Sequence, residues 1–183
     1  LEACDGDIEK SFDWVREKGI AKAAKKADRI AAEGLTAFVV EGDVAAIVEV
    51  NSETDFVAKN AEFQALVHTI AKAVVDNQPA DLEAALAVNV EGKDLATVIA
   101  EASGKIGEKI SLRRFQVLTK NADEEFGAYS HMGGKMTSVV KVANTTAEKA
   151  RDVAMHVAAS NPTYIDRRAI PQEVLDRELS VLK

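Results

Sequence analysis

Cysteine, proline and aromatic residues are all scarce in this sequence. A single cysteine, Cys4, stands among 183 residues, so the chain cannot form an intramolecular disulfide or a cysteine-rich metal site, and a reducing compartment is expected. Only 3 prolines and 10 glycines interrupt the chain, which predicts long regular elements and few disordered segments. Because aromatic residues make up only 5%, the core is expected to consist mainly of Ala, Val, Leu and Ile.

Positive charge and long apolar runs are also in short supply. The 23 basic residues are outnumbered by 30 acidic ones, and the formal net charge is −7. This balance argues against a protein whose main role is to bind nucleic acid or an anionic lipid surface. No run approaches the roughly 18 apolar residues of a transmembrane helix. What is present, 47% hydrophobic and 29% charged residues, is typical of a folded globular chain.

The two ends of the sequence have the character of internal segments. Residues 1–5 contain neither a start methionine nor a signal peptide pattern. Helix-like periodicity is already present at residue 1 and is still present at the other end, at Lys183. We therefore expect a fragment or a processed product of a longer protein.

The first 34 residues are predicted to be helical. After a turn at Asp5-Gly6, Asp7 is expected to cap a helix that begins at Ile8 and ends at Gly19. A second helix is expected over 20–32. Its basic side chains are Lys22, Lys25, Lys26 and Arg29. This basic stripe could contact RNA or an acidic partner, although a solvated helix face is the interpretation that we favour.

A hairpin followed by a helix is predicted next, and this arrangement recurs. Strands over 38–40 and 44–50 flank a Gly42 turn, and an amphipathic helix over 63–75 follows. The Ala-rich residues 80–103 predict one or two short helices. The remaining expected elements are a strand over 109–120, a hairpin over 126–143 with a Gly133-Gly134 turn, and a helix over 146–160. Pro171 is expected to open a last helix, in which Leu175, Leu179 and Leu182 have coiled-coil spacing.

The two hairpins with their helices indicate an internal duplication. Gly42 and Gly134 are 92 residues apart, but Val67-His68 and Met155-His156 are only 88 apart. The first copy therefore carries four extra residues between strand and helix, where Thr54-Asp55-Phe56-Val57 lies. An insertion at one such junction is a candidate functional site.

The three histidines do not predict a metal site. No two of His68, His131 and His156 have His-x-x-x-His spacing, which argues against zinc. His68 and His156 adjoin apolar helix faces and are expected to be packed or at a boundary. His131 precedes the Gly133-Gly134 turn, where it would either contact a partner or be an ordinary loop residue. No nucleophile and base are suggestively spaced, so an enzyme is not predicted.

Two glycine motifs have phosphate or RNA interpretations. Gly133-Gly134-Lys135 is followed by Met136 rather than the Ser or Thr of a phosphate-binding loop, and we reject it. Gly104–Gly107 has the Gly-x-x-Gly form of the loop that clamps RNA in KH domains, although a helix C-cap is the ordinary interpretation. An RNA-binding module that uses this loop and the stripe from Lys22 to Arg29 is therefore the alternative hypothesis.

Phe56 has two interpretations that the residues alone leave equal. A Phe at a turn, next to Asp55, suits insertion into a groove of another protein, and burial of such a ring is worth roughly 1.5–3 kcal/mol. However, Phe56 precedes Phe63 by seven residues, so a continuous helix would place both rings in the core.

Five sets of residues, taken in order along the whole chain, resemble the bacterial-type elongation factor Ts family. They are Gly6–Glu9 with Lys22–Ala27, Asn51–Lys59, Lys105–Ile110 with Arg113-Arg114, Tyr129–His131, and Met155–Ala159. The resemblance implies an α+β fold, in which a helical N-terminal remnant precedes two similar subdomains, each a small antiparallel sheet packed with helices. Lys135-Met136 departs from the family, which commonly has Arg and Ile there.

The resemblance also implies a division into domains. The expected parts are a remnant of a ubiquitin-associated-like helical domain (1–18), a linker helix (19–33), core subdomain N (34–124), an incomplete core subdomain C (125–170), and the start of a coiled-coil protrusion (171–183). A homodimer through the missing coiled-coil region is one implied assembly.

The implied function is that of a guanine-nucleotide exchange factor for elongation factor Tu, the GTPase that delivers aminoacyl-tRNA to the ribosome. The segment matching Thr54, Asp55, Phe56 and Val57 is expected to enter the GTPase domain and dislodge its Mg²⁺, and Ile106, Gly107 and His131 are expected to make further contacts. The resemblance implies no catalysis on the chain, no cofactor or metal of its own, no direct nucleic-acid or membrane partner, and a cytoplasmic or organellar-matrix location.

Overall fold

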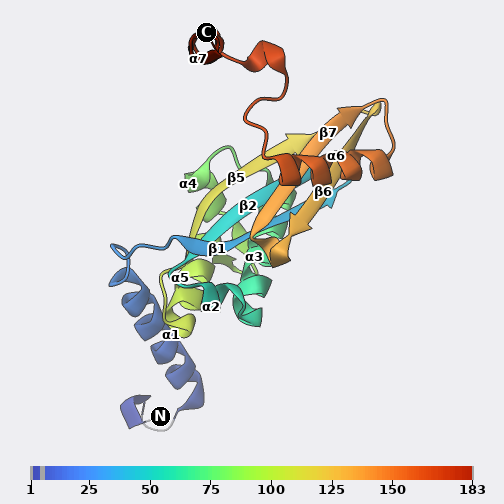
Figure 1. Cartoon of the computed structure of the whole chain (residues 1–183). Coiled ribbons are helices and arrows are strands. Elements are labelled where there is room, and N and C mark those ends of the chain that lie inside the picture. Colours follow the sequence, from blue (N-terminus) through green and yellow to red (C-terminus); the bar gives the residue numbers. More distant parts are fainter. Residues whose placement is uncertain (1, 5–6, 183) are drawn as a thin grey trace.

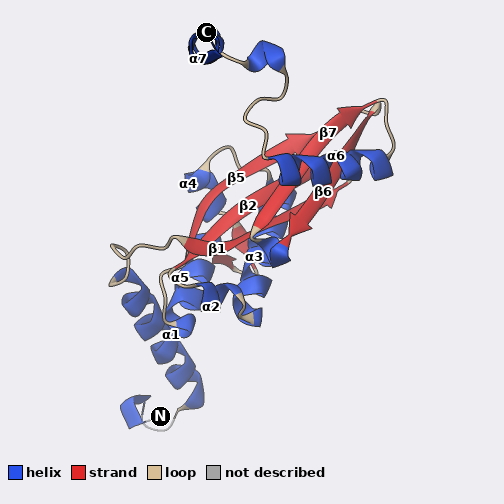
Figure 2. Cartoon of the chain, in the orientation of Figure 1, coloured by secondary structure: helices blue, strands red, loops and turns tan. Residues whose placement is uncertain are grey.

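Antiparallel sheets packed against helices make up the fold, which confirms the expected α+β class (Figures 1 and 2). A computed structural model describes residues 2–4 and 7–182. The predicted turn at Asp5-Gly6 lies outside the described residues, as do Leu1 and Lys183. Among those that are described, no helix is long and apolar enough to cross a membrane.

The N-terminal helix is longer than predicted. After the short 3-10 turn η1 (Glu2–Cys4), helix α1 (Ile8–Ala24) begins at the Asp7 cap, whose carboxylate accepts the Lys10 N–H at 3.1 Å. The prediction that the helix ends at Gly19 is wrong, because α1 continues through this residue. The separate helix predicted over 20–32 is wrong too, since residues 20–24 belong to α1 and residues 25–32 form turns and irregular chain.

A close approach of two helices explains why Gly19 does not end α1. A Cβ atom at Gly104, in helix α5 (Leu95–Ile106), would lie 2.5 Å from the Gly19 carbonyl oxygen. The two backbones can touch only because Gly104 carries no side chain. This contact between residues distant in sequence determines the path of α1, and no local pattern could reveal it.

The predicted basic stripe does not form a continuous surface. Lys26 is only 8% exposed, and its ammonium group donates a hydrogen bond to the Ser103 carbonyl at 3.1 Å. Arg29 lies beyond the helix and forms an ion pair with Glu53 at 3.3 Å. With Lys26 buried and Arg29 paired to Glu53 at the surface, two of the four cations are already engaged by the chain itself.

The first sheet has the strand order β1-β2-β5 and is antiparallel throughout. Strands β1 (Glu33–Glu41) and β2 (Val44–Ser52) form the predicted hairpin around Gly42, whose φ of 57° suits a tight two-residue turn. Strand β5 (Ser111–Thr119) confirms the strand expected over 109–120 and pairs with β2.

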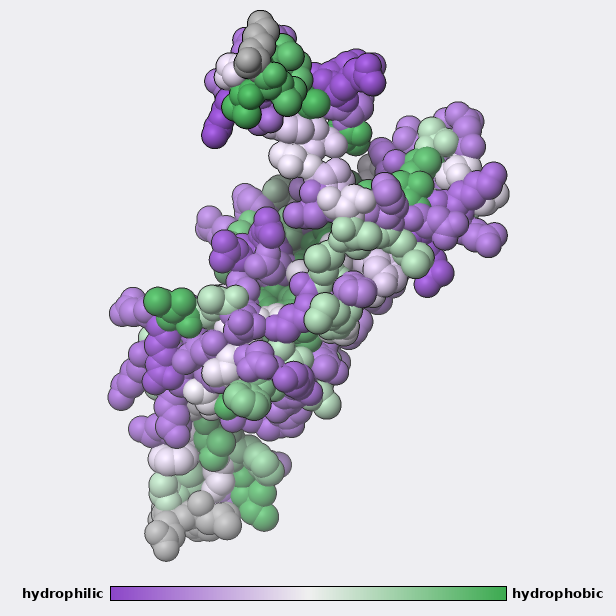
Figure 3. All heavy atoms as spheres, viewed as in Figure 1, coloured by the Kyte–Doolittle hydropathy of each residue, from purple (hydrophilic) through white to green (hydrophobic). Residues whose placement is uncertain are grey.

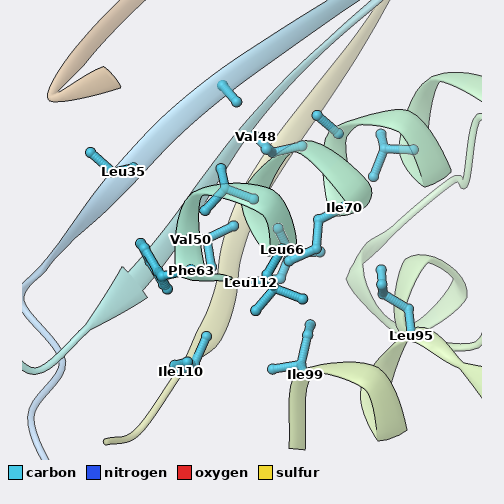
Figure 4. Packing of buried hydrophobic residues seen from close by; sticks show 14 of the residues in the cluster. Leu35, Val48, Val50, Phe63, Leu66, Ile70, Leu95, Ile99, Ile110 and Leu112 are labelled. Atoms are coloured by element: carbon cyan, nitrogen blue, oxygen red, sulfur yellow. The ribbon is translucent and has the colours of Figure 1, made fainter. Parts of the chain in front are cut away.

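The main core lies between this sheet and the helices α3 (Ala61–Asn77) and α5 (Figure 4). As expected, it is almost entirely aliphatic. The largest side chains that are less than 2% exposed are Phe63, Ile70, Leu95, Val48, Val50, Val67 and Val74. Full burial of each such side chain contributes roughly 1.5–3 kcal/mol, so the packing of α3 on the sheet dominates this part of the fold.

The Ala-rich segment forms two helices, within the prediction of one or two. Helix α4 (Leu82–Leu86) is followed by the two-residue strands β3 (Asn89–Val90) and β4 (Lys93–Asp94), and then by α5. Gly107 caps α5 with a φ of 91°, and its N–H donates to the Ser103 carbonyl. Gly104 thus lies within a helix and against Gly19, so the interpretation of Gly104–Gly107 as an RNA-clamping loop is wrong.

The second hairpin and its helix repeat the order of the first. Strands β6 (Glu124–His131) and β7 (Met136–Ala143) flank the 3-10 turn η2 (Met132–Gly134), and helix α6 (Ala147–Ser160) packs on both strands. The Ser138 hydroxyl donates to the Ala154 carbonyl at 2.6 Å. In the first copy, the four-residue helix α2 (Asp55–Ala58) lies at the position of the predicted insertion.

The chain continues through the 3-10 turn η3 (Arg167–Ala169) to helix α7 (Gln172–Leu182), at the opposite end of the molecule from α1 (Figure 1). Leu175, Leu179 and Leu182 of α7 are exposed. Apolar residues gather on the surface over both terminal helices (Figure 3). The limits proposed for the domains remain a prediction.

The helix contact at Gly104 predicts opposite effects for two similar substitutions. Gly104→Ala should lower the Tm by several degrees, because the new Cβ overlaps backbone atoms of Gly19 and such overpacking costs about 1–3 kcal/mol. Gly19→Ala is the matched control and should raise the Tm slightly. Its Cβ would meet no atom closer than 3.9 Å, and alanine favours a helix. Thermal unfolding followed by circular dichroism, and by fluorescence of the single tryptophan, Trp14 in α1, measures both. An equal Tm for the two variants would contradict the close contact.

Candidate functional site

The insertion between the first hairpin and α3 places Phe56 on the surface. Thr54 precedes α2 as its N-cap, and Asn60 then caps a separate helix, α3, by accepting the N–H groups of Glu62 and Phe63. Because α2 and α3 are two helices, Phe56 does not continue the buried face of Phe63. The Phe56 side chain is 78% exposed, whereas Phe63 is fully buried.

The other residues of α2 hold this short helix against the core. Val57 and Ala58 are 8% and 2% exposed and belong to the main hydrophobic cluster. The Ser52 hydroxyl donates to the Thr54 carbonyl at 3.1 Å. The segment is therefore two-sided, since Val57 faces the protein interior while Asp55 and Phe56 are presented to solvent.

Asp55 carries a negative charge at the same exposed site. The Lys59 ammonium group donates to its carboxylate at 3.1 Å, and this hydrogen bond is the main cause that lowers the pKa of Asp55, with a further contribution from the charge of Lys135. The carboxylate therefore stays ionised at neutral pH. Lys59 also lies 5.8 Å from the centroid of the Phe56 ring, within the range of a cation–π contact.

The C-terminus of α5 lies directly against this segment. Ile106 is half-buried against the main core, Gly107 is exposed, and the following residue, Glu108, accepts hydrogen bonds from the backbone of Glu53 and Thr54. The structure thus brings two of the further predicted contact residues, Ile106 and Gly107, next to the segment that contains Asp55 and Phe56.

His131 lies at the tip of the second hairpin, which packs across β1. It is exposed, and its Nδ1 is 2.9 Å from the Tyr129 hydroxyl. The tip is attached to β1 by the Thr36 hydroxyl, which donates to the Gly134 carbonyl at 2.8 Å, and by a 2.7 Å ion pair between Lys135 and Glu33. The short helix α2 and the turn η2 both contact β1, so the Asp55 segment and the hairpin tip lie on either side of the same strand.

A groove of about 390 Å³ lies between this hairpin tip and α3. Its lining includes Leu35, Ala37, Val67, His68, Ser130 and Gly133. His68 is exposed at this groove and His156 is exposed on α6, so neither is packed, although the sequence predicts that both are packed or at a boundary. No cluster of three or more His, Cys, Asp or Glu side chains that could hold a metal ion occurs in the described part of the chain.

Two acidic residues beside the segment were not among the predicted site residues. The Glu53 carboxylate accepts the Lys109 N–H at 2.6 Å, which is the main cause that lowers the pKa of Glu53. The Glu108 carboxylate accepts three hydrogen bonds from Glu53 and Thr54. These contacts join residues more than 50 positions apart, so spacing within the sequence contains no signal for them.

Comparison with known proteins identifies the family to which this arrangement belongs. The model of a family described as "Elongation factor TS" matches residues 53–183. Three relatives, each named elongation factor Ts, come from Pediococcus pentosaceus (54% identical over 182 residues), Limosilactobacillus fermentum (51% over 183) and Oenococcus oeni (49% over 181).

The match extends along this chain but not along its relatives. Between 99% and 100% of the chain is covered, whereas the chain spans only 62–63% of the length of each relative. The family model covers well over half of the chain, and the three relatives agree with it, which confirms the resemblance found in the sequence. The chain therefore belongs to the elongation factor Ts family.

Proposed function

We propose that this chain acts in translation elongation, in the cytoplasm, as the part of an exchange factor that promotes release of GDP from elongation factor Tu. In this proposal it binds the GTPase in its GDP-bound form, disturbs the Mg²⁺ and phosphate site, and allows GTP to enter after GDP has left. The observation that carries the proposal is the exposed Phe56 ring, presented on a short helix whose inner side is fixed in the core.

An exposed aromatic ring on a fixed support is suited to insertion into a partner. Phe56 is 78% exposed in a protein that has only 5% aromatic residues. Its burial in a groove of the GTPase would contribute roughly 1.5–3 kcal/mol. Because Val57 and Ala58 already hold α2 in place, little conformational entropy is lost when the ring enters the groove.

Asp55 supplies the charge that this mechanism needs. Its carboxylate remains ionised because hydrogen bonding to Lys59 lowers its pKa. Brought near a bound Mg²⁺ by the adjacent ring, an anion competes for the cation and its ligands. Loss of Mg²⁺ leaves the negative charges of the GDP phosphates uncompensated, so GDP dissociates. No covalent bond is formed or broken on the chain in this mechanism.

Ile106, Gly107 and His131 would enlarge the same contact. Ile106 and Gly107 lie beside the Asp55–Phe56 segment, and His131 lies at the hairpin tip whose Lys135 acts on Asp55. A contact that spans both subdomains would fix the orientation of the GTPase relative to the inserted ring. The alternative, an RNA-binding module, has less support in the fold, since Gly104 lies in a helix and Lys26 is buried.

Thermodynamic linkage sets the size of the required effect. If the chain weakens GDP binding by some factor, GDP must weaken binding of the chain by the same factor. A thousandfold preference for the nucleotide-free GTPase corresponds to about 4 kcal/mol. A few groups that become buried in the complex, such as Phe56, Asp55 and His131, are sufficient for a difference of this size.

Release of labelled GDP tests the proposal directly. Added to elongation factor Tu loaded with fluorescent GDP, the chain should accelerate release in a concentration-dependent manner that saturates, whereas an equal concentration of serum albumin should not. A release rate unaffected at every concentration would contradict the proposal. Tight RNA binding that weakens steeply with salt, together with an unchanged release rate, would favour the alternative instead.

Phe56→Ala should slow stimulated GDP release about tenfold or more while leaving the Tm nearly unchanged, because the ring contacts little of the chain itself but would be buried in the complex. Ile165→Ala is the matched control, since Ile165 is 95% exposed in the segment between α6 and η3, and it should leave release unchanged. Unaltered release by Phe56→Ala, with a Tm lowered by many degrees, would show that Phe56 acts in the core.

Asp55→Ala should weaken exchange without unfolding the chain, because its ion pair with Lys59 is exposed and such pairs contribute little to stability. The defect should be largest at high Mg²⁺ concentration, where the ion is hardest to displace. Asp76→Ala is the matched control, since Asp76 forms a similar exposed pair with Lys72 at the far end of α3. Equal exchange by Asp55→Ala and the unsubstituted chain across a Mg²⁺ titration would contradict this role.

A further inference from the structure

Glu108 makes an unusually complete set of contacts with the residues that precede Phe56. One carboxylate oxygen, Oε2, accepts the Glu53 N–H at 3.0 Å and the Thr54 N–H at 2.9 Å. The other oxygen, Oε1, accepts the Thr54 hydroxyl at 2.6 Å. Hydrogen bonds to an ionised acceptor are about twice as strong as neutral ones. A single side chain thus binds both backbone amides that lead into α2.

The contact is reciprocal, because Glu53 binds back to the residue that follows Glu108. The Glu53 carboxylate accepts the Lys109 N–H at 2.6 Å, and the Lys109 ammonium group donates to the carbonyls of Ala27 and Arg29. We call the hydrogen bonds that join Glu53 and Thr54 to Glu108 and Lys109 the Glu53–Glu108 network. It ties the entry to α2 to the end of α5.

The position of Glu108 follows from the way in which α5 ends. Gly107 adopts a φ of 91°, a conformation that other residues rarely adopt, and turns the chain out of the helix. The Ser103 hydroxyl then donates to the Glu108 carbonyl at 2.5 Å. Because α5 is anchored in the main core through Leu95 and Ile99, the Glu108 side chain is held by a rigid element.

The segment that receives these bonds has little means of ordering itself. Helix α2 has four residues, far fewer than the roughly 12–15 at which an isolated helix becomes marginally stable. Thr54, its N-cap, makes no side-chain hydrogen bond to the helix, because its hydroxyl is bonded to Glu108 instead. The burial of Val57 and Ala58 holds the inner side of α2, and Glu108 holds its beginning.

We propose that Glu108 is a positioning residue that orders the entry to α2, so that Phe56 and Asp55 are presented to the GTPase in their binding geometry before contact. The inference rests on the proposed exchange function and deepens it. Without Glu108 the binding-competent geometry would be populated for only a fraction of the time, and the apparent affinity would fall by that fraction. The maximal rate would be retained, because the ring and the carboxylate are still present.

Substitution of Glu108 separates positioning from direct contact. Glu108→Ala should raise the concentration of chain that gives half-maximal stimulation of GDP release by about tenfold, the size expected for loss of hydrogen bonds to a charged group. The maximal rate should stay within about twofold. Glu108→Gln should recover part of the loss, since its amide oxygen still accepts an N–H and its amide nitrogen can donate to the Thr54 hydroxyl.

Glu101→Ala, within α5, provides the matched control. Glu101 forms ion pairs with Lys93 and Arg16, at 2.7 and 3.2 Å, but makes no hydrogen bond to residues 53–57 among the contacts described. Its loss should leave the half-maximal concentration unchanged. The half-maximal concentration of the double variant Glu108→Ala/Phe56→Ala should be within about twofold of that of Phe56→Ala alone. Glu108 acts through the segment that presents the ring, so its loss adds little once the ring is gone.

Amide hydrogen exchange of the free chain tests the network without the GTPase. In Glu108→Ala the amides of Glu53 and Thr54 should exchange at least about tenfold faster, while those of α3 should be unchanged. Unchanged protection of Glu53 and Thr54, or a maximal release rate that falls with no shift in the half-maximal concentration, would overturn the inference.

The two proposals can fail separately. If the unsubstituted chain does not accelerate GDP release, the exchange function is wrong, and amide protection in Glu108→Ala then decides by itself whether Glu108 orders the segment. If the unsubstituted chain is active but Glu108→Ala resembles Glu101→Ala in both the release and the amide measurements, the exchange function stands and the positioning role is overturned.

Discussion

The packing of α3 on the β1–β2 hairpin is the interaction on which the rest of this structure depends. Phe63, Ile70 and Val74 of α3 are fully buried against the sheet. This burial fixes where α3 begins, and the cap at Asn60 therefore forces the preceding residues to form a separate short helix. Phe56 is exposed because the core is already complete without it, so the site is a consequence of the packing beneath it.

A second constraint is that the surface around Phe56 is assembled from distant parts of the chain. The first hairpin supplies Glu53 and Thr54, the end of α5 supplies Glu108, and the second hairpin brings Lys135 within electrostatic reach of Asp55. The first part contributes ordered backbone, the second a rigid support and the third a positive charge. The proposed exchange function needs all three, because in that proposal a cation and a nucleotide are displaced by binding energy alone.

Much of the fold could be predicted from local patterns, and the exceptions have physical reasons. Alternation of apolar residues predicted both hairpins, and 3.6-residue periodicity predicted α3 and α6, because each of these elements buries one face. Gly19 was misjudged since its local signal is that of a helix end, whereas its actual contact is with Gly104. His68 was misjudged because an apolar neighbourhood in the sequence does not show which side of a helix is covered.

The sequence by itself determined the fold class and the family, because these follow from periodicity and from motifs in a fixed order, and it marked Thr54–Val57 as extra residues between strand and helix. It could not decide whether Phe56 was core or surface, since both interpretations satisfy the seven-residue spacing to Phe63. Only the tertiary structure decided this, by ending α2 before α3 begins and by exposing the ring. It also revealed Glu108, whose hydrogen bonds join residues 54 and 55 positions apart. Contacts of that range arise from packing, which no local pattern encodes.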